Sequence, residues 1–266
     1  GIVLDIEKIA EVAHRHGVPL VVDNTLASPY LLRPFEWGAD IIVHSTTKFI
    51  GGHGNTMGGM IVESGKFDWF QNDKFPALSE PDAAYHGLTF GETFGDFAFT
   101  MKTRAVALRD YGPTLAPMAA WNLLQGVETL PLRMERHCSN AQAVAEYLQA
   151  HPKVAWVSYA GLKSSPYHEL AKKYLPKGCG AVFTFGLKGG YEAGIQVVDK
   201  VNMFSHLANI GDTRSLIIHP ASTTHRQLSE EQQIGAGAGP DVVRLSVGIE
   251  TVTDIIADLD QALATL

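Results

Sequence analysis

The first 45 residues alternate between apolar and polar positions in a way typical of one helix followed by two strands. Apolar residues recur at helical spacing over 4–13, Asp5 stands where an N-cap is expected, and Gly17 supplies a stop. The continuous apolar runs 20–22 and 41–43 predict strands buried on both faces, as in a parallel sheet covered by helices. Polar residues directly after such strands lie at their carboxyl ends, where open α/β sheets bind ligands.

The remainder of the chain predicts further strands and a second unit. A glycine-rich turn precedes another candidate strand at 60–62, and we expect the aromatic-rich stretch 66–100 to pack within the fold or at a subunit contact. Helical spacing over 134–150 predicts a long helix, and we place a domain boundary near Thr129 with an α+β unit after it. Its expected elements are strands at 154–159, 181–187, 215–218 and 242–247 and a final helix from Asp254.

The start of the chain carries an expectation of its own. A helix that feeds a buried parallel strand is normally the second half of a strand–helix–strand crossover. The sequence begins at Gly1, without Met, and shows no first strand for that crossover. We therefore expect the C-terminal part of a longer protein, interrupted inside its sheet.

Composition narrows the class of protein. The 21 Lys and Arg against 28 Asp and Glu give a net charge of −7, whereas nucleic acids and anionic membranes need clustered positive charge. Apolar residues make up 45%, enough for a sizeable core, yet no run reaches the roughly 18 residues of a membrane span. The 2 cysteines have neither a disulfide framework nor the paired spacing of a zinc site. We expect a soluble cytoplasmic protein without a bound metal.

Two polar clusters stand after the first two predicted strands. Asp23 follows one strand, and Ser45, Thr47 and Lys48 follow the other. Alone, such an aspartate is usually a turn residue and such a lysine is usually solvated. Together they suggest more, because a lysine can form a Schiff base, hydroxyls beside a glycine-rich turn can bind a phosphate, and an aspartate can pair with a pyridinium nitrogen. These are the parts of a pyridoxal phosphate site.

Longer motifs surround these residues and recur later in the chain. The first group is Val22-Asp23-Asn24-Thr25, His44-Ser45-Thr46-Thr47-Lys48 and Gly51-Gly52-His53. The second is Gly211-Asp212, 215–217, 219–225 and 243–250. Together they resemble the Cys/Met-metabolism family of pyridoxal phosphate enzymes along nearly the whole chain. The resemblance implies a fold type I α/β enzyme, with 1–128 the remainder of a large, mostly parallel cofactor-binding domain and 129–266 a small C-terminal α+β domain.

The resemblance also implies roles for single residues in holding the cofactor. Lys48 would carry pyridoxal phosphate through a Schiff base and later move protons. Asp23 would hold the pyridinium proton, so that the ring withdraws electrons from the substrate. Ser45 and Thr47 would bind the phosphate.

Within the family, the stretch 85–113 and the run Asn209-Ile210-Gly211-Asp212 are most similar to O-acetylhomoserine sulfhydrylases. Arg244 would then grip the substrate α-carboxylate, with Asn209 beside it. The implied reaction replaces acetate on Cγ of O-acetyl-L-homoserine by sulfide or a thiol such as methanethiol, giving homocysteine or methionine. The resemblance further implies a homo-oligomer, either a dimer or a tetramer.

Two alternatives stay open at this point. The chain could belong to a sibling enzyme, a cystathionine γ-synthase or a methionine γ-lyase, which product analysis would distinguish. It could also be an inactive folded fragment of such an enzyme that only self-associates, because an open sheet edge leaves backbone groups unpaired.

Overall fold

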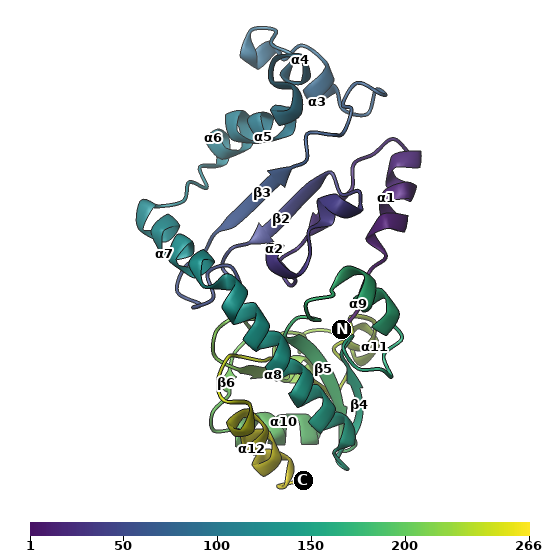
Figure 1. Ribbon diagram of the computed structural model, residues 1–266, viewed down its shortest axis with the longest axis vertical. Coiled ribbons are helices and arrows are strands. Elements are labelled where there is room, and N and C mark those ends of the chain that lie inside the picture. The colour runs from purple at the N-terminus through teal and green to yellow at the C-terminus, as the bar shows by residue number, and fades with distance from the viewer.

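The computed structural model describes residues 1–266, which form two sheets flanked by helices (Figure 1). The first sheet has the order β1-β2-β3, and the second has the order β4-β5-β8-β7-β6. The strands are β1 Val21–Asp23, β2 Ile41–Ser45, β3 Gly59–Glu63, β4 Val154–Ser158, β5 Val182–Leu187, β6 Ser205–His206, β7 Leu216–Ile218 and β8 Val242–Ser246. The helices are α1 Ile6–Arg15, α2 Ser28–Leu31, α3 Pro76–Ser79, α4 Phe90–Phe94, α5 Ala98–Lys102, α6 Arg109–Tyr111, α7 Pro117–Glu128, α8 Leu130–Ala150, α9 His168–Tyr174, α10 Gly190–Lys200, α11 Glu230–Gly235 and α12 Val252–Leu263.

The first sheet is parallel on one side of β2 and antiparallel on the other. Val21 of β1 pairs with Ile41 in the parallel sense, which brings the carboxyl ends of β1 and β2 to the same edge. The predicted strand at 60–62 is present as β3 and runs antiparallel to β2. Central β2 is buried as predicted, but β1 is an edge strand and the Val21 side chain is 51% exposed. The prediction that 20–22 is buried on both faces is therefore wrong, because β1 packs against β2 and no helix packs extensively on its faces.

The first helix begins and ends where the sequence predicts. The Asp5 carboxylate accepts a hydrogen bond from the Lys8 backbone N–H at 3.5 Å, and α1 buries Ile6 and Ala10. Gly17 adopts a left-handed φ of 61°, which ends the helix at little steric cost.

The aromatic stretch folds into a small core of its own. Trp69, Leu78 and Phe90 are buried there, and the rings of Phe67 and Phe75 meet edge-to-face at 5.5 Å. This confirms that much of the stretch 66–100 packs within the fold.

The second sheet forms the main core with α8, α10 and α12. Central strands β5 and β8 bury Phe185 and Leu245 completely, and α8 buries Val144 and Leu148 against them. The predicted strands and the final helix are present with slightly shifted ends, and α8 begins at Leu130, earlier than the predicted 134. The domain boundary near Thr129 stays a prediction.

Membrane crossing has no candidate among these elements. None of the helices is at once long enough and apolar enough to span a bilayer.

Candidate active site

Lys48 lies in a tight turn that follows the central strand β2. The Gly51 N–H donates to the Thr46 carbonyl at 2.9 Å, and the Gly52 N–H donates to the Lys48 carbonyl at 2.7 Å. Gly52 has a left-handed φ of 76°, a conformation that suits glycine. The backbone that carries the Lys48 side chain is therefore fixed by hydrogen bonds within the turn.

The other polar residues predicted for the cofactor stand at the same edge of the sheet. One Asp23 carboxylate oxygen accepts from the Thr25 N–H at 3.0 Å, and the Thr25 hydroxyl accepts from the Ser45 N–H at 2.8 Å. Thr25 thus joins the ends of β1 and β2. The Thr47 hydroxyl is already engaged, since it accepts from the Gly58 N–H at 3.0 Å and lies 3.3 Å from the Gly58 carbonyl.

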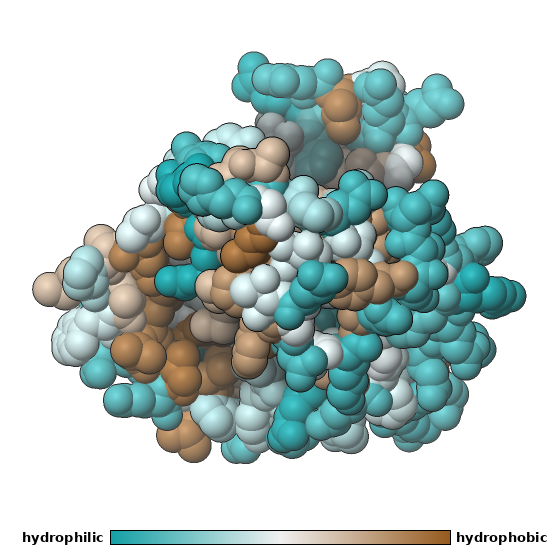
Figure 2. All heavy atoms as spheres, turned by 90° about the horizontal axis from the view of Figure 1, so that it is seen from above, coloured by the Kyte–Doolittle hydropathy of each residue, from teal (hydrophilic) through white to brown (hydrophobic).

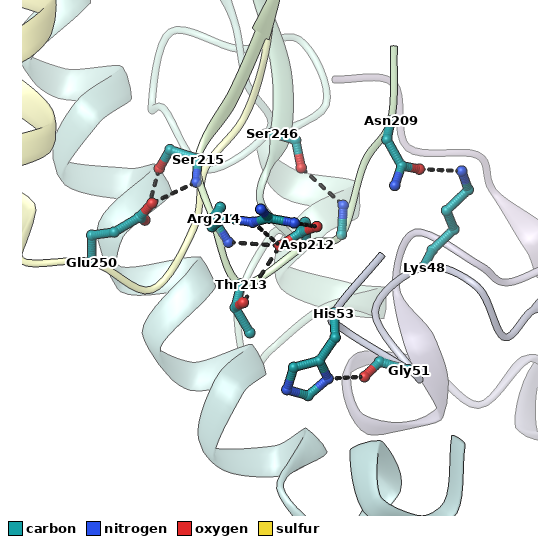
Figure 3. Close-up of polar contacts among 11 residues, drawn as sticks. Lys48, Gly51, His53, Asn209, Asp212, Thr213, Arg214, Ser215, Ser246 and Glu250 are labelled. Atoms are coloured by element: carbon teal, nitrogen blue, oxygen red, sulfur yellow. Dashed lines mark hydrogen bonds and ion pairs between the residues drawn. The ribbon is translucent and has the colours of Figure 1, made fainter. Parts of the chain in front are cut away.

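A chain of contacts connects Lys48 in the turn after β2 with Arg244 in β8, although β2 and β8 belong to different sheets. The Lys48 ammonium donates to the side-chain oxygen of Asn209, as Figure 3 shows. The Asn209 carbonyl in turn accepts from the Arg244 guanidinium at 3.3 Å. Burial lowers the pKa of Arg244, and its hydrogen bond goes to a neutral carbonyl. The structure therefore brings together three of the predicted site residues: Lys48, Asn209 and Arg244.

The backbones of the two segments touch at Gly211. A Cβ atom at this position would lie 2.7 Å from the Phe49 nitrogen, and φ is 73°, so both space and conformation favour glycine. The Gly211 N–H donates to the Ser246 hydroxyl at 2.9 Å. Two residues on, the Thr213 N–H donates to the Gly52 carbonyl at 2.8 Å. The loop that carries Asn209 is therefore fixed against both the lysine turn and β8.

Asp212 and Glu250 stiffen this loop from either side (Figure 3). The buried Asp212 carboxylate accepts from the Arg214 backbone N–H at 3.0 Å and from its guanidinium at 3.1 Å. Burial raises the pKa of Asp212, but the hydrogen bonds from Arg214 outweigh it and hold this pKa below its ordinary value. Glu250 accepts from the Ser215 N–H at 2.6 Å and from its hydroxyl at 2.9 Å.

A shallow surface pocket of about 430 Å³ is lined by Ala208, the residue before Asn209 in the sequence. Ile218 lines it and pairs directly with Arg244 across β7 and β8. Its other lining residues include His206, Ser222, Thr224 and Arg226.

The donor set at this edge fits pyridoxal phosphate. Lys48 would supply an amine for the cofactor's carbonyl carbon, Asp23 a carboxylate for its ring nitrogen, and Ser45 a half-buried hydroxyl for its phosphate. Thr47 fits less directly, because its hydroxyl is bound to Gly58.

Two residues that shape the site were not among those predicted for it. Asp212 lies in one of the family motifs, which imply no role for it, and Arg133 lies outside those motifs. Arg133 is 5% exposed, and it lies on the α8 face that also buries His137. A lone arginine preceding apolar positions at helical spacing is a weak signal that could have drawn attention to it.

Comparison with known proteins identifies the class. A model of the Cys/Met metabolism PLP-dependent enzyme family matches residues 2–264, and the chain therefore belongs to this family. The resemblance stated from the motifs is confirmed, and so is the dependence of the family on pyridoxal phosphate.

Two curated relatives match the chain over nearly its whole length. The chain is 56% identical over 261 residues to homocysteine synthase of Schizosaccharomyces pombe, covering 97% of this chain and 61% of that protein. It is 53% identical over 272 residues to O-acetyl-L-homoserine sulfhydrylase of Leptospira meyeri, covering 99% and 61%. The chain thus spans about three fifths of the length of these relatives.

A solved structure confirms the fold. The chain superposes with a TM-score of 0.94 and 43% identity on a putative O-acetylhomoserine (thiol)-lyase from Campylobacter jejuni, covering 99% of this chain and 63% of that one. That protein contains N'-pyridoxyl-lysine-5'-monophosphate. The predicted α/β fold of a pyridoxal phosphate enzyme is therefore correct.

Proposed function

We propose that this protein is an O-acetylhomoserine sulfhydrylase, which replaces the acetate of O-acetyl-L-homoserine by sulfide or a small thiol. The single observation that carries the proposal is the chain of contacts from Lys48 through Asn209 to Arg244. These contacts support a site in which the Lys48 amine moves protons and the Arg244 guanidinium holds an amino-acid carboxylate. The names of relatives at 56% and 53% identity support the choice of substrate.

Four residues would hold the cofactor and one would hold the substrate. Pyridoxal phosphate, when bound, withdraws electrons from the substrate. Lys48 attaches it, Asp23 keeps a proton on its ring nitrogen, and Ser45 and Thr47 bind its phosphate, Thr47 after exchanging its present contact with Gly58. Arg244 binds the α-carboxylate through its planar, permanently charged fork.

Proton transfer is the chemical work of the protein itself. The Lys48 amine removes a proton from Cα and later returns one, while the carboxylate held by Arg244 stays fixed. Acetate leaves from Cγ, and sulfide adds to the same carbon. The overall exchange converts O-acetyl-L-homoserine and hydrogen sulfide into homocysteine and acetate.

We also propose a cytoplasmic homo-oligomer. Both cysteines are free thiols, which suits a reducing compartment. Helix α7 exposes Met118, Trp121 and Leu124, and exposed apolar groups of this kind favour association.

Product analysis tests the proposal. The protein, supplied with pyridoxal phosphate and O-acetyl-L-homoserine, is given sulfide, methanethiol or cysteine, and in a fourth reaction it is given methionine alone. We expect homocysteine and acetate in equal amounts with sulfide, and no product from Lys48→Ala. Arg244→Lys should raise KM for O-acetyl-L-homoserine about tenfold or more, because charged hydrogen bonds contribute about 1.5–3 kcal/mol.

Each alternative predicts a different result. Cystathionine as the main product from cysteine would show a cystathionine γ-synthase, and methanethiol from methionine would show a γ-lyase. No product in any reaction, with the protein folded, would show the inactive alternative.

A further inference from the structure

Arg133 of α8 is a buried cation that the proposed reaction does not use. Its guanidinium donates to the carbonyls of Phe49 at 2.6 Å, Ile50 at 3.1 Å and Gly126 at 2.7 Å, and its Nε donates to the Thr129 hydroxyl at 3.2 Å. None of these acceptors is a carboxylate. A buried charge is tolerated only when hydrogen bonds replace its hydration. These hydrogen bonds therefore compensate the buried charge of Arg133 and hold the accepting carbonyls in place.

Two of the acceptors are the residues that directly follow Lys48. By holding the Phe49 and Ile50 carbonyls, Arg133 fixes the direction in which the backbone leaves Lys48. The third carbonyl, that of Gly126, lies in the last turn of α7. One side chain thus joins the lysine turn to the junction between α7 and α8.

Glycines shape the space around the guanidinium. A Cβ atom on Gly52 would lie 2.4 Å from the Arg133 Nη1 atom, and one on Gly126 would lie 2.5 Å from the Ile50 carbonyl oxygen. At both positions the absence of a side chain makes room for the planar guanidinium and the carbonyls that it binds. The site is closely fitted to arginine.

The same face of α8 also reaches the strand that carries Arg244. One turn after Arg133, the His137 ring packs edge-to-face on Phe49 at 5.2 Å and lies 2.7 Å from the Val247 carbonyl. Because Val247 directly follows β8, α8 sets the position of the Lys48 turn relative to Arg244.

We propose that Arg133 is a positioning residue, which aims the Lys48 side chain by holding the two carbonyls that follow it. The inference rests on the proposed role of Lys48. A lysine at 133 cannot replace the arginine, because a compact ammonium cannot reach the acceptors of the lysine turn and of the α7–α8 junction at once.

Hydrogen exchange and cofactor trapping together test this inference on Arg133→Lys. In the variant without added cofactor, we expect the amides of 46–52 to exchange about tenfold faster or more, since opening of the turn exposes them. With pyridoxal phosphate added, borohydride should trap the cofactor on Lys48 at least about tenfold more slowly. The kcat should fall by about 10- to 100-fold with KM changed less than about threefold, because misplacement of a reacting group by about 1 Å can cost that much in rate. Leu78→Ala is the control for lost stability, because Leu78 is buried in the separate cluster around Trp69.

A second pair of variants covers the case in which Arg133→Lys does not fold. Gly52→Ala pushes a methyl group against the guanidinium, while Gly190→Ala has a similar φ of 62° and nothing within 4 Å. Only Gly52→Ala should speed exchange at 46–52 and slow trapping. Unchanged exchange in both Arg133→Lys and Gly52→Ala, or equal effects in the controls, would overturn the inference. Faster exchange without any trapping on wild-type Lys48 would support the inference and count against the proposed function instead.

Discussion

A single buried histidine makes the stability of the protein depend on pH. His137 is fully buried, its Nδ1 atom lies 2.7 Å from the Val247 carbonyl, and its Nε2 atom has no partner. Burial lowers the pKa of His137 to about 4. In the unfolded chain a histidine binds its proton near pH 6.5, so the unfolded state takes up protons first as the pH falls. The stability due to neutral His137 is therefore complete above pH 6.5 and is lost on the way down to pH 4.

We predict that His137→Gln removes this dependence. Between pH 6.5 and 4 the free energy of unfolding of the wild type should fall by about 3 kcal/mol because of this residue, since each pH unit between the two pKa values corresponds to about 1.4 kcal/mol. Urea unfolding at a series of pH values measures the difference between the two proteins. His16→Gln, at an exposed position, should keep the wild-type profile. Parallel curves for wild type and His137→Gln would contradict the assignment.

Among the elements, α7 and α8 differ in burial: α8 buries polar side chains, whereas α7 exposes apolar ones. Buried polar residues of α8 hold the site: Asn140, for example, donates to the carbonyls of Gly248 at 3.0 Å and Glu250 at 2.8 Å. By contrast, α7 leaves most of its apolar side chains in solvent, and Trp121 is 57% exposed. Figure 2 shows apolar side chains gathered on the side of the molecule where Figure 1 places α6 and α7.

We predict that α7 lies in a contact between subunits. Trp121→Glu should shift the mass measured by light scattering from an oligomer toward a monomer, because it places a charge where apolar surface is buried. Glu231→Lys changes an exposed charge on α11 and should leave the mass unchanged. A monomeric wild type, or an oligomer that Trp121→Glu does not weaken, would show that α7 is not the contact.

At the scale of the whole molecule, local sequence patterns predicted the positions of the strands better than they predicted contacts between distant segments. Runs of apolar residues located most strands, and the polar residues after 20–22 and 41–43 do stand at one edge of a sheet. The exposure of Val21 could not be predicted in the same way, because an apolar run does not tell which elements will cover the strand. The two-residue strand β6 has no periodicity to detect.

The candidate site shows the same limit. Motifs named Lys48, Asn209 and Arg244, and the structure places them in one chain of contacts. Arg133 escaped notice because its importance lies in backbone carbonyls 83 and 84 positions away, and carbonyls leave no trace in a sequence. Residues that bind a ligand stand in recognisable motifs, whereas a residue that binds backbone leaves at most a weak signal in the sequence.

The most direct test of the account is to locate the lysine that binds the cofactor. The protein is incubated with pyridoxal phosphate, reduced with borohydride, weighed intact and then mapped by peptide mass. The account predicts one reduced cofactor per chain, attached to Lys48, and none in Lys48→Ala. A chain that stays unmodified, or that carries the cofactor on another lysine, would contradict it.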